Sequence, residues 1–173
     1  MNNLQKHSRH LLLVLCVLAL TACGFHLRGM TQMSFKTLHI QNASASAPLM
    51  RELSRSLASS GVTVVPRQDE AEMLLELMQE NTEKRILSLS GGGRVREYEL
   101  VYQLTVRVRS ASDTLWSEPH TIEQRRDFSY DDRELLAKEG EEARLYSSMR
   151  SEAVREIIRR LSVQQAGAPA ASQ

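Results

Sequence analysis

The sequence has few aromatic residues, few cysteines and no excess of either charge. Aromatic side chains make up 5% of the 173 residues, and two cysteines are present. The 22 lysines and arginines nearly balance the 21 aspartates and glutamates. A nearly neutral chain has no overall field that attracts polyanions, so nucleic acid is not an expected partner. Any anionic ligand has to be bound by a local cluster of cations.

A hydrophobic run long enough to span a bilayer is also missing. The run at 11–20, LLLVLCVLAL, is about half the roughly 20 apolar residues that a membrane-spanning helix needs. It follows a polar stretch containing Lys6 and Arg9 and leads into small residues. This order is typical of a secretory signal peptide, which we predict over residues 1–22.

The end of that segment has the pattern of a bacterial lipobox. Leu20, Thr21 and Ala22 precede Cys23, whose thiol would accept a diacylglyceryl group before cleavage frees its amine for N-acylation. More than one acyl chain gives stable anchoring, so Cys23 is predicted to hold the mature protein on a membrane. Gly24 follows in place of the aspartate that commonly retains lipoproteins in the inner membrane, which favours the outer membrane.

The mature chain offers little for catalysis or for a cofactor. With Cys16 removed and Cys23 acylated, no thiol remains for a disulfide, a metal or a nucleophile. His26, His39 and His120 have no second ligand at helical spacing, and no G-x-S-x-G motif is present. We therefore predict neither an enzyme nor a metal site, and no cofactor besides the lipid on Cys23.

Hydrophobic periodicity divides the mature chain into two parts. The first has a strand at 35–41, a helix from Pro48 to a capping Gly61, and a strand at 62–65, which together form a βαβ unit. The second has strands at 72–89, 94–109 and about 115–128, and the middle one alternates strictly between apolar and polar side chains.

The last predicted element is an amphipathic helix. Its apolar residues recur every three or four positions, at Tyr146, Met149, Ala153, Ile157 and Leu161. Gly140 is expected to delay the start of this helix to about Glu141, and residues 163–173 are expected to form a disordered tail.

These elements predict one α+β domain over residues 23–162. Two amphipathic helices and a sheet with one wet face favour a two-layer sandwich. The helices would pack on a mixed, mostly antiparallel sheet of about four strands.

Basic residues gather around the predicted turn at Gly91-Gly92-Gly93 and at the start of the last helix. They are Lys84, Arg85, Arg94, Arg96 and Lys138. One interpretation is an ordinary solvated surface of mixed charge. The other is a set of donors for an anionic ligand such as a phosphorylated lipid, because guanidinium groups chelate phosphate oxygens.

Three stretches of the chain resemble one family, the LPS-assembly lipoproteins LptE (also called RlpB). They are the junction CGFHLRG at 23–29, REYELVYQLTV at 96–106, and FSYDDRELLAKEGEEARL at 128–145. The order of the predicted elements agrees as well, and the resemblance extends to about Leu161.

The resemblance implies a lipid-anchored protein of the outer membrane. It implies that the chain sits inside the β-barrel LptD on the periplasmic side, plugs and helps to assemble that barrel, and binds lipopolysaccharide (LPS) on its way to the outer leaflet. It also implies that Lys138 stands where the family carries a basic residue. Two alternatives remain open from the residues alone: an auxiliary lipid-binding lipoprotein of a transporter, and a cell-envelope enzyme.

Overall fold

The computed structural model describes residues 33–42 and 44–164, which form five strands, two helices and two short 3-10 turns. The predicted signal peptide, Cys23 and residues 165–173 lie outside the described residues. The strands are β1 Thr37–Asn42, β2 Thr63–Val64, β3 Met73–Leu89, β4 Val95–Ser110 and β5 His120–Ser129. The helices are α2 Ala47–Ser59 and α3 Leu135–Gln164, and the 3-10 turns are Gln68–Glu70 and Asp132–Glu134.

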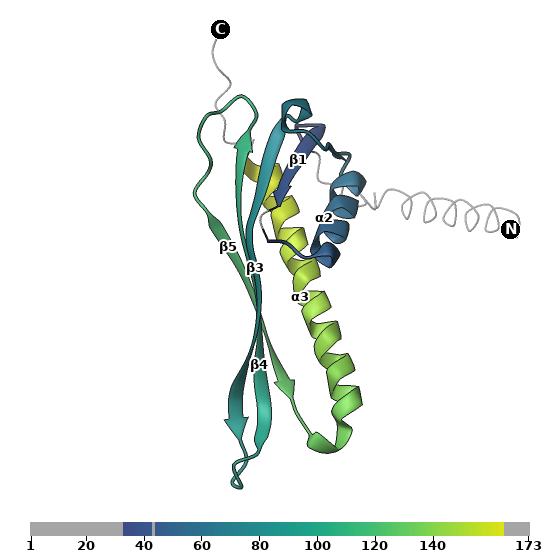
Figure 1. Cartoon of the computed structure of the whole chain (residues 1–173), viewed down its shortest axis with the longest axis vertical. Helices are drawn as coiled ribbons and strands as arrows, with labels where there is room; N and C mark the ends of the chain where they lie inside the picture. Colours follow the sequence, from purple (N-terminus) through teal and green to yellow (C-terminus); the bar gives the residue numbers. More distant parts are fainter. Residues whose placement is uncertain (1–32, 43, 165–173) are drawn as a thin grey trace, which may run out of the picture.

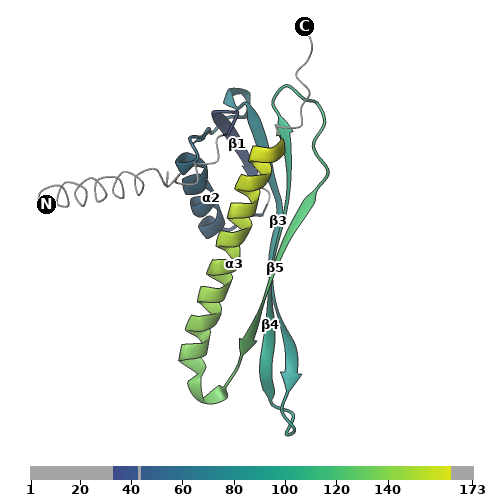
Figure 2. The ribbon, with the colours of Figure 1, turned by 180° about the vertical axis from the view of Figure 1, so that it is seen from behind.

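The predicted two-layer α+β sandwich is confirmed (Figures 1 and 2). The sheet has the order β2-β1-β3-β4-β5, and both helices lie on the same side of it. It has five strands rather than about four. β1 runs parallel to its two neighbours, whereas β3, β4 and β5 form an antiparallel meander, so the sheet is mixed.

The predicted βαβ unit is formed by β1, α2 and β2. Ser46 caps α2 by accepting a hydrogen bond from the Leu49 backbone N–H at 3.3 Å, and Pro48 occupies the first turn, where no N–H is needed. Gly61 follows the helix with φ +80°, a left-handed conformation that glycine adopts without strain. Leu49, Leu53 and Leu57 are fully buried against the sheet.

The long hairpin of β3 and β4 turns at Gly91-Gly92-Gly93, as predicted. The loop is closed by a hydrogen bond of 2.7 Å from the Ser90 N–H to the Arg94 carbonyl oxygen. Within the loop, Gly93 has φ +76°. Such a three-residue loop needs a residue with positive φ, which glycine supplies. The hairpin extends past the beginning of α3, at the lower end of Figure 1.

The alternation of apolar and polar residues in β4 places its apolar side chains on one face of the sheet, as predicted. Leu100, Tyr102, Leu104, Val106 and Val108 are buried on the face that packs against the helices. The core continues into α3 through Met149, Ala153, Ile157 and Leu161. The predicted stripe of the last helix is therefore its core face.

Two predicted boundaries are wrong. β5 begins at His120 rather than near Leu115, because Pro119 has no N–H to donate and Trp116 lies over the guanidinium groups of Arg107 and Arg109. The helix α3 begins at Leu135 and passes straight through Gly140, because Asp131 caps the preceding 3-10 turn through the Arg133 N–H. α3 ends at Gln164.

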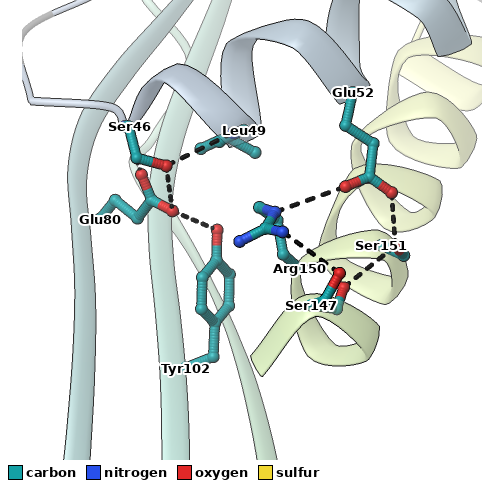
Figure 3. A network of polar contacts seen from close by, with 8 residues as sticks. All are labelled: Ser46, Leu49, Glu52, Glu80, Tyr102, Ser147, Arg150 and Ser151. Carbon is teal, nitrogen blue, oxygen red and sulfur yellow. Dashed lines mark hydrogen bonds and ion pairs between the residues drawn. The ribbon is translucent and has the colours of Figure 1, made fainter. Parts of the chain in front are cut away.

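Polar side chains fix the helices to each other and to the sheet (Figure 3). Glu80 accepts hydrogen bonds from the Ser46 N–H at 2.5 Å and from the Tyr102 hydroxyl at 2.8 Å, which ties the start of α2 to β3 and β4. Glu52 on α2 accepts from Ser151 and from Arg150 on α3. These contacts set the position of α3 along the sheet, and with it the position of the cleft described next.

Candidate functional site

The structure divides the five predicted basic residues between four places. Lys84 pairs with Leu100 in the register of the sheet, so it lies on the face that carries the helices, and Arg96 shares that face. Lys138 lies on the first turns of α3. Arg85 pairs with Glu99 on the opposite face, and Arg94 lies at the end of the hairpin turn.

Three of these cations already have carboxylate partners. The Lys84 Nζ lies 2.6 Å from Glu142, and the Lys138 Nζ lies 2.9 Å from Glu141. The Arg85 guanidinium lies 2.6 Å from Glu83. Their charges are largely neutralised in the absence of a ligand.

Arg94 and Arg96 differ from the other three. Within residues 33–42 and 44–164, neither guanidinium has an ion-pair partner, and both residues are exposed. Their donors are free to bind a ligand. Of the predicted cluster, these two arginines are the residues best placed to bind an anion.

An aromatic cluster separates Lys84 and Lys138 from the core. The rings of Tyr98 and Tyr130 meet edge to face with centroids 5.3 Å apart, and Tyr98 is stacked with the buried Phe128 at 6.4 Å. The Lys84 Nζ lies 4.3 Å from the centroid of Tyr98, and the Lys138 Nζ lies 5.5 Å from that of Phe128. The cation–π attraction holds both ammonium groups at the edge of the cluster.

A cleft of about 810 Å³ opens beside this cluster, between the hairpin and the start of α3. Leu89 and Arg96 line it from the hairpin, Tyr130 from the end of β5, and Arg133 and Lys138 from the following segment. The Arg133 guanidinium donates to Asp131 at 2.8 Å and lowers the pKa of that carboxyl to about 2. Asp131 therefore stays ionised and neutralises Arg133, whereas Arg96 has no ion-pair partner among the residues that the structure describes.

Reasoning from the sequence missed the aromatic cluster and Arg133. The alternation of β4 puts Tyr98 on the core side of the sheet, but its neighbours Phe128 and Tyr130 lie about 30 residues further on, at the end of β5. One feature of the sequence does point to the cluster. Aromatic residues are rare in this chain, and these three fall at the ends of two neighbouring strands.

The two histidines that the structure describes have structural contacts. The ring Nδ1 of His39 lies 3.1 Å from the Val65 carbonyl oxygen, and the Nε2 of His120 lies 3.6 Å from Glu156. In the described part of the chain, no three His, Cys, Asp or Glu side chains gather as they would around a metal ion. Over the same residues, no helix is long and apolar enough to cross a bilayer.

Solved structures with this fold come from small bacterial lipoproteins. The solution structure of lipoprotein B from Nitrosomonas europaea has a TM-score of 0.73 and 32% identity, covering 83% of this chain and 94% of that one. The crystal structure of rare lipoprotein B from Shewanella oneidensis has a TM-score of 0.67 and 28% identity, covering 76% of this chain and 97% of that one. The fold thus defines the class, a lipoprotein-type α+β domain.

Sequence comparison identifies the family within that class. The profile of LptE, described as lipopolysaccharide-assembly, matches residues 35–161. The LPS-assembly lipoproteins LptE of Photorhabdus laumondii and Pectobacterium atrosepticum are each 30% identical, over 153 and 156 residues. Each alignment covers 87% of this chain and 83% of the relative. The chain belongs to the LptE family, as the resemblance predicted.

Proposed function

We propose that this chain is a lipid-anchored outer-membrane protein that plugs the LptD β-barrel, helps to assemble it, and binds LPS for insertion into the outer leaflet. The family match over residues 35–161 is the observation that carries this proposal. LPS assembly is not a catalytic role, so the proposal requires no enzymatic activity. The acyl groups on Cys23 would hold the domain beside the barrel and raise the effective concentration of each partner for the other.

The open face of the sheet supports the plug role. Opposite the helices, polar side chains pair between strands: Gln103 with Glu123 at 2.6 Å, and Thr105 with Thr121 at 2.9 Å. Charges on this face are also paired, as in the contact between Arg107 and Glu76. A barrel lumen is polar, so a plug has to present a surface of this kind.

The cleft supports binding of LPS rather than a general lipid carrier. Its lining is mostly charged, and it is open to solvent, whereas a carrier needs an enclosed apolar cavity. Phosphate groups are matched by guanidinium donors, and Arg96 in the cleft and Arg94 at the nearby hairpin turn have no ion-pair partner among the described residues.

Extraction of outer membranes tests the plug role. The tagged full-length protein, solubilised in mild detergent, should co-purify with LptD in a stable complex that mass spectrometry identifies. Recovery of the protein as a free monomer from the same extracts would contradict the proposal.

Charge reversal tests the LPS-binding role separately. The triple variant Arg94→Glu, Arg96→Glu, Lys138→Glu should lose most binding of the purified protein to immobilised LPS, while its circular dichroism is unchanged. Arg51→Glu, an exposed position on α2, is the matched control and should bind as the wild type does. Unchanged binding by the triple variant would remove this site while leaving the plug role standing.

A further inference from the structure

Large apolar side chains lie exposed at the far end of β3. Ile86, Leu87 and Leu89 are 60%, 50% and 56% exposed, although they belong to a strand of the central sheet. They lie beyond the part of the sheet that α2 covers, on the hairpin at the lower end of Figure 1 and Figure 2. Successive side chains of a strand point to opposite faces, so these three residues make this end of the hairpin apolar rather than one face of it, and we call them the hairpin patch.

The backbone next to the hairpin patch has no neighbouring strand on its outer side. β1 pairs with β3 only as far as Leu77, so the outer edge of β3 from Gln79 to Leu89 has no strand partner within the described residues. The Tyr146 hydroxyl donates to the Glu83 carbonyl at 2.9 Å and occupies one acceptor of that edge. An exposed apolar edge of this kind promotes aggregation unless something covers it.

A strand from another polypeptide is a poor fit for this edge. The register between β3 and β4 shifts between Ile86 and Ser88, and again between Ser88 and Leu89. Such irregularities twist the strand and break the regular spacing of its donors and acceptors, which strand addition requires. The patch therefore offers side chains rather than backbone hydrogen bonds.

Unpaired positive charge lies immediately beside the hairpin patch. Residues 86–97 contain two arginines, Arg94 and Arg96, and one acidic residue, Glu97. Arg94 and Arg96 have no ion-pair partner in the part of the chain that the structure describes. Leu89 lines the same cleft as Arg96 and Lys138. Apolar side chains next to free guanidinium groups complement an anionic amphiphile, with acyl chains on one side and phosphate on the other.

We propose that Ile86, Leu87 and Leu89 form an acyl-chain subsite for LPS, beside the phosphate donors Arg94 and Arg96. This inference rests on the proposed LPS-binding function and adds to it the part of the ligand that the hairpin contacts. Binding of the acyl chains covers the hairpin patch, and the arginines orient the headgroup toward the cleft.

Binding of two forms of the ligand tests the subsite. The purified full-length variant Ile86→Thr, Leu87→Thr, Leu89→Thr should bind LPS about tenfold more weakly than the wild type, since three half-exposed side chains lose their apolar contact. Its binding to fully deacylated LPS, which keeps sugars and phosphates, should equal that of the wild type. The double variant Arg94→Glu, Arg96→Glu should bind both LPS and deacylated LPS more weakly than the wild type.

Leu115→Thr is the matched control, because Leu115 is an 83% exposed leucine in the loop before β5, away from the hairpin. It should leave the affinity for LPS unchanged. Equal LPS binding by the hairpin variant and the wild type overturns the subsite, as does an equal effect of Leu115→Thr. A wild-type protein that binds no LPS would instead refute the proposed function. If the hairpin variant fails to fold, by circular dichroism, the single change Leu87→Thr replaces it.

Crosslinking in cells provides a second measurement on the intact chain. A photoreactive amino acid at Leu87 should capture LPS, and the same residue at Leu115 should not. Capture of a polypeptide in place of LPS at Leu87 would overturn the proposal and identify the patch as a protein-docking surface.

Discussion

Glu80 is a charged residue at the meeting point of three elements. Its carboxylate receives the Ser46 N–H and hydroxyl from the start of α2 and the Tyr102 hydroxyl from β4 (Figure 3). A carboxylate at the beginning of a helix also interacts favourably with the helix dipole. Burial, together with Glu80, raises the pKa of Tyr102, so its hydroxyl stays protonated and remains a donor.

Tyr102→Phe tests the contribution of this hydrogen bond. Tyr102 is 1% exposed, and its hydroxyl donates to an ionised acceptor, so its removal should cost about 1.5–3 kcal/mol of unfolding free energy. Urea denaturation followed by Trp116 fluorescence measures the change. Tyr98→Phe is the control, because the Tyr98 hydroxyl has no hydrogen bond to any described residue. It should change stability by less than about 0.5 kcal/mol. Equal losses in both variants would argue against the Glu80 contact.

The ion pair of Glu152 and Arg126 makes stability depend on acid pH. Arg126 donates to both carboxylate oxygens, at 2.6 and 2.7 Å, and lowers the pKa of Glu152 below its ordinary value. Because the pKa is lower in the folded state, the ion pair stabilises the protein fully at pH values above the unfolded-state pKa. This stabilisation is lost as pH falls through the folded-state pKa.

Glu152→Gln should therefore reduce stability near pH 7 by about 0.5–1 kcal/mol, the range of a partly exposed pair. The difference from the wild type should begin to shrink as pH falls below about 4.3, the ordinary pKa of glutamate, and should vanish once pH has fallen through the depressed folded-state pKa. Thermal melts from pH 3 to pH 7 would show the two curves converging. Parallel curves across that range would contradict the assignment.

At the scale of elements, the two halves of α3 are held by different forces. From Met149 onward the helix buries Ala153, Val154, Ile157 and Leu161 against the sheet. From Leu135 to Ser148 no described side chain is fully buried. Leu145 and Tyr146 are partly buried against the core, and Lys138, Glu142 and Tyr146 make polar contacts with the sheet. The half of α3 that borders the cleft is thus the more weakly held half.

Truncation of one apolar side chain in each half measures this difference. Met149→Ala should lower the unfolding free energy by about 2–4 kcal/mol, because Met149 is fully buried and its loss leaves a cavity. Leu136→Ala, at an 84% exposed position of the same helix, should stay within about 0.5 kcal/mol of the wild type. Chemical denaturation of both variants tests the contrast, and similar losses would show that the first half is also packed.

At the scale of the whole molecule, the proposed anchor and the folded domain are separate units. Cys23 precedes the first described residue, Met33, by ten positions, and among the described residues the buried core runs from Phe35 to Leu161. We therefore expect attachment to the membrane to leave the packing of this core unchanged.

Cys23→Ala should release the protein from the outer membrane while its circular dichroism and melting temperature stay those of the wild-type domain. Cys16→Ala is the matched control, since Cys16 lies inside the predicted signal peptide, and should leave both properties unchanged. Membrane fractionation and labelling with radioactive palmitate measure the outcome. Palmitate incorporation into Cys23→Ala would contradict the assignment of the lipid to this residue.

The sequence by itself determined the elements of the fold. Alternation in β4, the cap at Ser46, the left-handed glycine at Gly61 and the stripe of α3 are local signals, since each depends on residues a few positions apart. The same locality explains the failures at Leu115 and Gly140. Trp116 lies outside β5 and contacts Arg107 and Arg109 of β4. Gly140 is helical because it lies inside α3, whose other residues form the helix on both sides of it.

Only the tertiary structure decided which basic residues are available to a ligand. The five cations looked equivalent in the sequence, but Lys84 is paired with Glu142, 58 positions away, and Arg85 lies on the other face of the sheet. Pairing over such distances depends on where α3 crosses the hairpin, which no local pattern encodes. Within the described part of the chain, the same packing leaves Arg94 and Arg96 without an ion-pair partner beside an exposed apolar strand, because the hairpin extends past the beginning of α3.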